Sequence, residues 1–156
     1  MQDDATLEAA DRLALDRFLP YQLSVLTNRV SDAIARQYSE RFDLTIPEWR
    51  VMAVLGNTPG LSASEVAART AMDKVQVSRA VANLVENDRV ERSADAQDGR
   101  ITRLALSPRG QAIYHQVAPL ALDLEARLIA TLSADERKSL DAIMHKLSRQ
   151  IALLTP

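Results

Sequence analysis

The segment 62–110 constrains the fold of this chain more than any other part of its 156 residues. Ser62 and Glu65 have the spacing of a capping box and predict the start of a short helix. Asp73 is placed to cap a second helix, which we expect to end near Asn87. Two capped helices separated by a short turn predict a helix-turn-helix.

A β-hairpin is predicted directly after the second helix. Residues 90–92 and 101–106 are rich in strand-forming types, and the polar stretch between them ends in Asp98-Gly99-Arg100. A helix-turn-helix followed by such a hairpin is the layout of a winged helix-turn-helix, in which the second helix suits the major groove of DNA and the basic wing suits the minor groove.

Long amphipathic helices are predicted on both sides of this unit. Apolar residues recur at helical spacing before it, in a region from about residue 7 to 41 that is interrupted near Pro20, and after it, in a helix that follows a capping box at Ser133 and Glu136. Neither stripe has a predicted partner large enough to cover it within one chain, so we expect a homodimer. The stripes consist of Leu23, Leu26, Val30, Ile34 and Tyr38, and of Leu140, Ile143, Met144, Leu147, Ile151 and Leu154.

Composition agrees with a mainly α protein, since the chain is 47% hydrophobic and holds few helix breakers, with 4 glycines and 6 prolines. We therefore expect a winged helix-turn-helix with a small β-hairpin wing at 45–110, flanked by helical dimerisation segments at 1–44 and 111–156. A further capping box, Thr45 with Glu48, begins the first helix of the central part.

Charge supports contact with DNA only locally. The whole chain has a net charge of −2, but residues 69–109 hold eight cations against six acids. Phosphate binding requires a basic face rather than a basic protein. The pattern predicts double-stranded DNA as partner, and the net charge keeps open a dimeric helical module that binds ligands or proteins and does not read DNA.

The predicted DNA contacts come from both parts of the unit. On the second helix, Gln and Asn suit adenine, Arg suits guanine, and Ser or Lys suits a phosphate. At the wing, an arginine at the tip can enter a narrow minor groove, braced by the aspartate two residues before it. The candidates are Ser62, Lys74, Gln76, Ser78, Arg79, Asn83, Arg92, Asp98, Arg100 and Arg103.

The run from Asp98 to Gly110 resembles the wing signature of the MarR family of bacterial transcriptional regulators, an Asp-x-Arg followed by Leu-x-Leu-(Thr/Ser)-x-x-Gly. Leu61-Ser62 and Val77-Ser78-Arg79 with Leu84 also match the family pattern. The chain departs from it at Asp88, where glycine is usual, and at Arg89, where the family has a leucine-like residue. We expect Asp88 to be tolerated at a helix end, and Arg89 to snorkel or reach a phosphate.

The resemblance implies a homodimer whose first and last helices interlock, acting as a repressor that a small aromatic or anionic effector releases from a pseudo-palindromic operator. Family members bind such effectors between the dimer helices and the DNA-reading unit. The candidate lining here is Tyr38, Trp49, Arg50, Met52 and His115, although core packing is favoured for Trp49 and Met52.

Other classes find little support. The chain has no cysteine, no glycine-rich phosphate loop and no cluster with metal-ligand spacing, so we expect no catalytic residue, no metal and no cofactor. The acidic start, Met1 to Asp4, is unlike a signal peptide, and no apolar run approaches the roughly 20 residues that span a bilayer. We expect a cytoplasmic protein that does not contact membranes.

Overall fold

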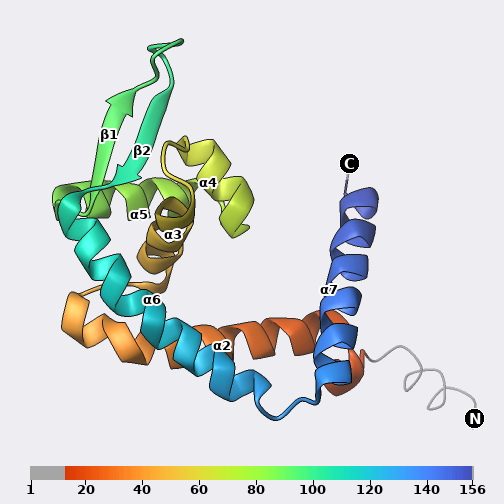
Figure 1. The fold of residues 1–156 in the computed structure, drawn as a ribbon. Helices are drawn as coiled ribbons and strands as arrows, with labels where there is room; N and C mark the ends of the chain where they lie inside the picture. The colour runs from red at the N-terminus through yellow and green to blue at the C-terminus, as the bar shows by residue number, and fades with distance from the viewer. Residues whose placement is uncertain (1–12, 156) are drawn as a thin grey trace, which may run out of the picture.

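The computed structural model describes residues 13–155 (Figure 1). The acidic start of the chain and the predicted helical residues 7–12 lie outside the described part. The elements follow in the order η1 (Leu15–Arg17), α2 (Leu19–Phe42), α3 (Ile46–Asn57), α4 (Ala63–Thr70), α5 (Lys74–Glu86), β1 (Val90–Ala94), β2 (Thr102–Leu106), α6 (Pro108–Ile129) and α7 (Ala134–Leu154). The fold is mainly helical with one two-stranded antiparallel sheet, as the sequence predicts.

The N-terminal helical region has the predicted boundary near Pro20. This proline lies in the first turn of α2, where its missing N–H costs no helical hydrogen bond. The helix ends at Phe42 because Asp43 adopts the left-handed conformation, with φ 49°. The long apolar helix thus occupies one end of the predicted segment, and the chain turns sharply before α3.

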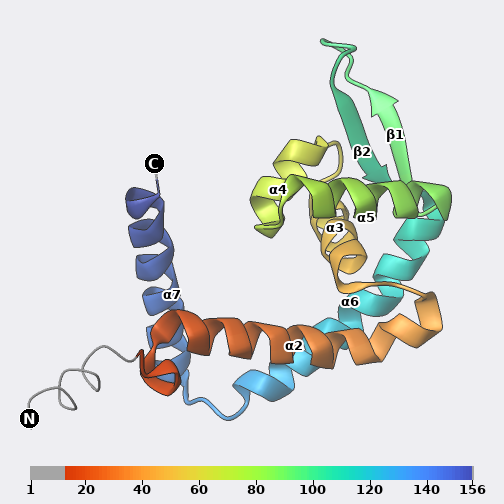
Figure 2. The ribbon, with the colours of Figure 1, turned by 180° about the vertical axis from the view of Figure 1, so that it is seen from behind.

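The hydrophobic core lies around α3, which is packed between α5 on one side and α2 and α6 on the other (Figures 1 and 2). Val51 and Met52 on this helix are fully buried. Val66 of α4, Val77 and Leu84 of α5 and Leu104 of β2 close the same core. Helices α3, α4 and α5 with the hairpin hold most of this core, which Tyr38 of α2 and Ile113 and Val117 of α6 help to complete. This unit, residues 46–106, is called here the reader.

The hairpin is longer than predicted at its first strand, because β1 continues to Ala94. Its register pairs Val90 with Leu106 and Ala94 with Thr102. Leu104 and Leu106 face the core at 2% and 7% exposure, so one side of the wing base is anchored in the reader. Leu61 adds an isolated antiparallel bridge to Leu104, which ties the residue before α4 to the wing.

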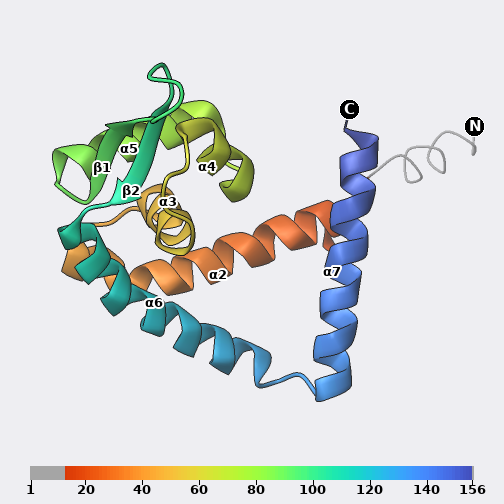
Figure 3. The same cartoon turned by 45° about the horizontal axis from the view of Figure 1, so that its top comes forward.

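Helix α6 leads away from the reader, and α7 then runs back beside it as a separate arm (Figure 3). Ser107 caps α6, accepting a hydrogen bond from the Gly110 N–H at 2.9 Å. Helix α7 begins with the predicted capping box of Ser133 and Glu136. None of the residues of α7 from Ala134 to Leu154, all of them described, is buried. Its apolar stripe is exposed, as the sequence predicts for a surface that another chain covers.

Candidate nucleic-acid interface

The turn between α4 and α5 is built from local backbone devices. Ala71 adopts the left-handed conformation with φ 52° and ends α4, and Met72 is buried beside the turn at 7% exposure. Asp73 then caps α5, its carboxylate accepting from the Gln76 N–H at 2.8 Å. The capping box of Ser62 and Glu65 fixes the start of α4 in the same way. Together these devices set the position of α5 in the reader.

Helix α5 buries one stripe and exposes the rest. Its buried residues are Val77, Ala80, Val81 and Leu84. The five polar residues that the sequence proposes as DNA contacts on this helix are all exposed, namely Lys74, Gln76, Ser78, Arg79 and Asn83. Val75 is also exposed, at 58%, and sequence reasoning did not propose it. The sequence did contain a signal for Val75, because this apolar residue lies outside the stripe of α5 that is buried.

The wing tip is ordered by aspartates. The carboxylate of Asp95 accepts hydrogen bonds from the N–H groups of Gln97, at 2.8 Å, and Asp98, at 2.9 Å. Those backbone bonds, with a side-chain bond from Arg103, lower the pKa of Asp95 to about 2. The carboxylate therefore stays charged and holds the tip through the whole neutral range.

Arg100 is exposed at the tip of the wing. Its side chain is 95% exposed, and its Nε lies 3.5 Å from Asp98 Oδ1, as the bracing role predicted for Asp98 requires. Asp98 also accepts a hydrogen bond from the Arg100 N–H at 3.1 Å. A guanidinium in this position can reach a DNA backbone or a minor groove without breaking any contact within the core.

Arg103 is engaged inside the protein. Its Nε donates to Asp95 at 2.6 Å, and its Nη1 donates to Glu65 at 2.9 Å and to the Gly60 carbonyl at 3.3 Å. Hydrogen bonds from Ser62 and the Arg103 charge lower the pKa of Glu65, which keeps it available as an ionised partner. Arg103 therefore fastens the wing to the start of α4, and its contact with DNA stays a prediction.

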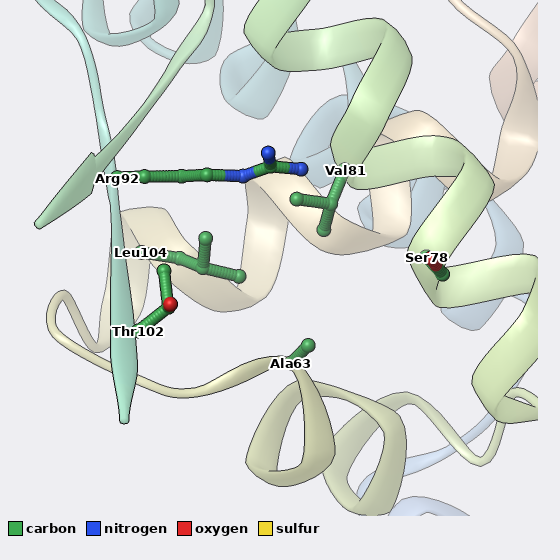
Figure 4. A pocket seen from close by; sticks show the side chains of 6 residues that line it. All are labelled: Ala63, Ser78, Val81, Arg92, Thr102 and Leu104. Atoms are coloured by element: carbon green, nitrogen blue, oxygen red, sulfur yellow. The ribbon is translucent and has the colours of Figure 1, made fainter. Parts of the chain in front are cut away.

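A hollow of about 230 Å³ separates α5 from the wing (Figure 4). Arg92 extends from β1 across this hollow toward α5, and Ser78 borders it from α5. Both residues are predicted DNA contacts, so the structure brings one candidate of the wing and one of the helix to the same hollow. Its remaining lining consists of Ala63, Val81, Thr102 and Leu104.

The prediction for Arg89 is wrong, because this residue neither snorkels nor reaches toward DNA. It is 6% exposed, and its guanidinium donates to the carbonyls of Phe42, at 2.5 Å, and Asp43, at 2.9 Å. These carbonyls stand at the C-terminal end of α2, where unpaired carbonyls and the helix dipole favour a cation. Arg89 thus joins the end of α2 to the connection between α5 and the wing.

The chain direction at Arg89 is set by its neighbours. Asp88 takes the left-handed conformation, with φ 56°, that glycine usually supplies, as expected for a tolerated helix end. The Arg89 N–H then donates to Leu84 at 2.7 Å, which completes the cap of α5. Gly110 is required opposite, because a Cβ there would lie 1.9 Å from the Arg89 carbonyl oxygen. The ends of α2, α5 and β2 and the start of α6 meet here.

Four of the five predicted effector residues lie on α2 and α3 near the contact of these helices, whereas His115 is exposed on α6. Tyr38 and Met52 are core residues, at 1% and 0% exposure, and burial raises the pKa of Tyr38 to about 12. The Trp49 ring is partly buried, with its centroid 5.6 Å from that of Tyr38. Core packing is thereby confirmed for Met52 and for much of Trp49.

The two polar effector candidates make contacts of their own. Arg50 donates to the Ser31 hydroxyl at 3.1 Å and so connects α3 to α2. The His115 ring lies 5.7 Å from the ring of Tyr114. Farther along α2 and α6, a separate apolar hollow of about 390 Å³ is lined by Val30, Ile34, Ala121, Leu122, Leu124, Glu125, Leu128 and Ile129. Effector binding by the five candidates stays a prediction.

Residues 13–155 hold few features that point to other chemistry. Within this range no three His, Asp or Glu side chains are grouped as metal ligands. In the same residues, each helix is too short or too polar to cross a bilayer.

The fold and its exposed α5 and wing define a winged helix-turn-helix regulator of transcription. A model of the MarR family matches residues 42–101. The HTH-type transcriptional repressor Rv2887 of Mycobacterium tuberculosis is 27% identical over 131 residues, which cover 83% of this chain and 91% of that protein.

Solved structures extend the likeness to the flanking helices. A MarR/EmrR family transcriptional regulator from Acinetobacter sp. ADP1 superposes with a TM-score of 0.83 at 25% identity, over 90% of this chain and 99% of that one. MepR of S. aureus, solved in complex with DNA, shares the fold with a TM-score of 0.76 at 22% identity, over 85% and 98%. The chain is thus similar to MarR family regulators, in sequence over residues 42–101 and in fold over most of its length.

Proposed function

We propose that the protein is a sequence-specific repressor that binds a pseudo-palindromic operator as a homodimer and is released by a small ligand. The observation that carries this proposal is the exposed surface of α5, which presents five polar side chains beside a wing whose tip arginine is 95% exposed. The MepR complex with DNA, which has the same fold, supports it. A regulator of this kind would act in the cytoplasm, where bacterial DNA is.

The exposed residues divide by chemistry. Gln76 and Asn83 can pair with adenine and Arg79 with guanine, because their side chains offer two polar contacts to a base edge in the major groove. Lys74 and Ser78 suit phosphates, which fix the register without reading sequence. Arg100 suits the minor groove, and Arg92 suits a phosphate near the hollow between α5 and the wing.

The second copy of this chain is the proposed partner of α7. The exposed apolar residues of α7 face the first turn of α2 across an apolar groove of about 400 Å³, lined among others by Leu19, Leu23, Met144, Leu147 and Ile151. Covering such a continuous stripe is what stabilises interlocked helical dimers. A symmetric pair would present two α5 helices about 34 Å apart, one turn of DNA.

Ligand release is proposed through α2 and α6. Both helices connect the proposed dimer contact to the reader, and the hollow of about 390 Å³ between them has the size and apolar lining of a small-molecule site. A ligand that changes the angle between these helices would change the distance between the two recognition helices. The pair would then no longer fit both half-sites.

Selection of bound fragments from random duplex DNA tests the proposal. We expect enrichment of an inverted repeat with half-sites about one helical turn apart, and binding that weakens steeply with salt because phosphate contacts release counterions. Candidate ligands are then added to the complex. A dimer that enriches no sequence and shows no salt-dependent duplex binding would instead favour a helical ligand-binding or protein-interaction module.

Three substitutions assign the contacts. Arg100→Ala should lower affinity for all duplexes and reduce the salt slope by about one charge, whereas Gln76→Ala and Arg79→Ala should change sequence preference by about 1–3 kcal/mol. Glu86→Ala, at the far end of α5, is the matched control. If all three variants bind like the unaltered protein, the assignment of these residues is wrong.

A further inference from the structure

Val75 differs from every other exposed apolar residue of the described chain by its place. It is the second residue of α5 and is 58% exposed. The other large apolar side chains that are exposed within residues 13–155 lie before or within α2, in α6 or in α7, where the proposed dimer contact or the neighbouring hollows account for them. Within the reader, Val75 alone of the described large apolar side chains stands exposed in this way.

The position of Val75 on the helix is the outermost one. With about 100° between successive residues, Val75 lies opposite the middle of the buried stripe that runs from Val77 to Leu84. Arg79 lies one turn farther along the same outer line, and Gln76 and Ser78 flank it. The ridge of α5 that would enter deepest into a groove therefore begins with an apolar side chain and continues with a cation.

The floor of the major groove offers one apolar group to such a side chain. Adenine, guanine and cytosine present hydrogen-bond donors and acceptors there, whereas thymine also presents its 5-methyl group. A valine pressed against a polar base edge would strip water from a donor or acceptor without replacing the hydrogen bond. Against a thymine methyl it would instead bury apolar surface on both sides.

We propose that Val75 contacts the methyl group of a thymine in each half-site and so determines specificity at that base pair, an inference that rests on the proposed reading of DNA by α5. The thymine is expected close to the base that Arg79 reads. Side chains four residues apart on a helix are about 6 Å apart, and base pairs rise by about 3.4 Å. The two bases are therefore one or two steps apart.

Deoxyuridine isolates this contact. It keeps every hydrogen-bonding group of thymine and lacks only the 5-methyl group, so replacing the thymines of the selected half-site one at a time removes one methyl each. We expect one position per half-site at which the replacement weakens binding of the full-length dimer by about fourfold, the value of one buried methyl-sized group. Replacing that position in both half-sites should weaken binding by about sixteenfold, because the two sites are distant and independent.

Two variants link the effect to Val75. Val75→Ser removes both methyl groups of the side chain, so it should bind the thymine operator more weakly and show no further loss with deoxyuridine. Val75→Thr has the same shape and keeps one methyl, so it should retain part of the sensitivity. Since Val75 is exposed and makes no core contact, all three proteins should have the same melting temperature.

The possible outcomes distinguish failure of the Val75 contact from failure of the proposed DNA binding. If the unaltered protein binds its selected operator but no deoxyuridine position matters, Val75 reads no methyl group and the inference is overturned. The same holds if Val75→Ser keeps the full sensitivity, or if the selected half-site contains no thymine. If the unaltered protein binds no duplex at all, the proposed function fails and the inference falls with it.

Discussion

The reader and helix α7 contain apolar residues in similar abundance but use them differently. In the reader, Val51, Met52 and Leu84 are at 0% exposure, whereas in α7 Ile143 and Ile151 are more than half exposed. The reader buries its apolar side chains within one chain, because the helix-turn-helix, α3 and the base of the wing pack against one another. Helix α7 leaves its apolar stripe exposed, and only another surface, such as that of the proposed second copy, can bury it. Under the proposed dimer, folding and assembly are therefore encoded in separate segments.

The largest expected effect is on assembly. Ile151→Asp places a charge on the exposed stripe of α7, and burying an unpaired carboxylate in a dimer contact costs several kcal/mol. We expect the dimer dissociation constant to rise about a thousandfold, or about 4 kcal/mol, in sedimentation equilibrium. Arg149→Asp, on the opposite side of the same helix, is the matched control and should remain dimeric. A dimer of unchanged strength in Ile151→Asp would remove α7 from the interface.

The next effect is confined to the reader. Leu84→Ala creates a cavity at a fully buried position of α5, and such changes cost about 2–5 kcal/mol. Urea unfolding should show a loss of about 3 kcal/mol, whereas the neighbouring exposed substitution Asn83→Ala should stay within about 0.5 kcal/mol. Equal effects of the two variants would show that the reader lacks the closed core described above.

A smaller effect is expected where the reader meets the end of α2. Arg89→Leu removes the two hydrogen bonds that the guanidinium donates to the end of α2, and bonds of this charged kind contribute about 1.5–3 kcal/mol. We expect stability to fall by about 2 kcal/mol and amide exchange to rise in the last turn of α2. Arg89→Lys keeps a cation that can donate to the same carbonyls and should restore part of the loss. Unchanged exchange at this turn would show that the contact does not hold α2.

The smallest effect concerns the stability of the wing tip at low pH. The pKa of Asp95 is lowered from its ordinary value of 3.8 to about 2, so the stability it contributes is present above pH 3.8 and is lost as the pH falls through about 2. Carboxyl chemical shifts should show this low midpoint. In Arg103→Ala the pKa of Asp95 should move part of the way back, because the hydrogen bonds from the Asp98 and Gln97 backbone remain. A midpoint near 3.8 in the unaltered protein would contradict the ordered tip.

The sequence predicted the elements whose signals are local. Capping boxes at Ser62 and Ser133 are formed by residues three positions apart, and the hairpin strands alternate within five or six residues, so neighbours in the chain decide them. The exposed stripe of α7 was also predicted, since apolar residues at helical spacing lie on one side of a helix whatever the rest of the fold is.

Long-range partners were not predictable in this way. Arg89 meets the carbonyls of Phe42 and Asp43 across 46 or more residues, and Arg103 meets Glu65 across 38, so neither pairing leaves a spacing pattern in the sequence. A leucine-like family position suggested burial for Arg89, but a charged side chain suggested the opposite. Burial wins because the end of α2 supplies carbonyls that the guanidinium can satisfy. Val75 was missed because apolar residues are ordinarily assigned to a core.

The contact of Arg89 with the end of α2 is a mechanical link between that helix and the reader. It consists of a guanidinium that donates to two backbone carbonyls. Since both carbonyls belong to the end of α2, a shift of that end would move the segment between α5 and the wing with it.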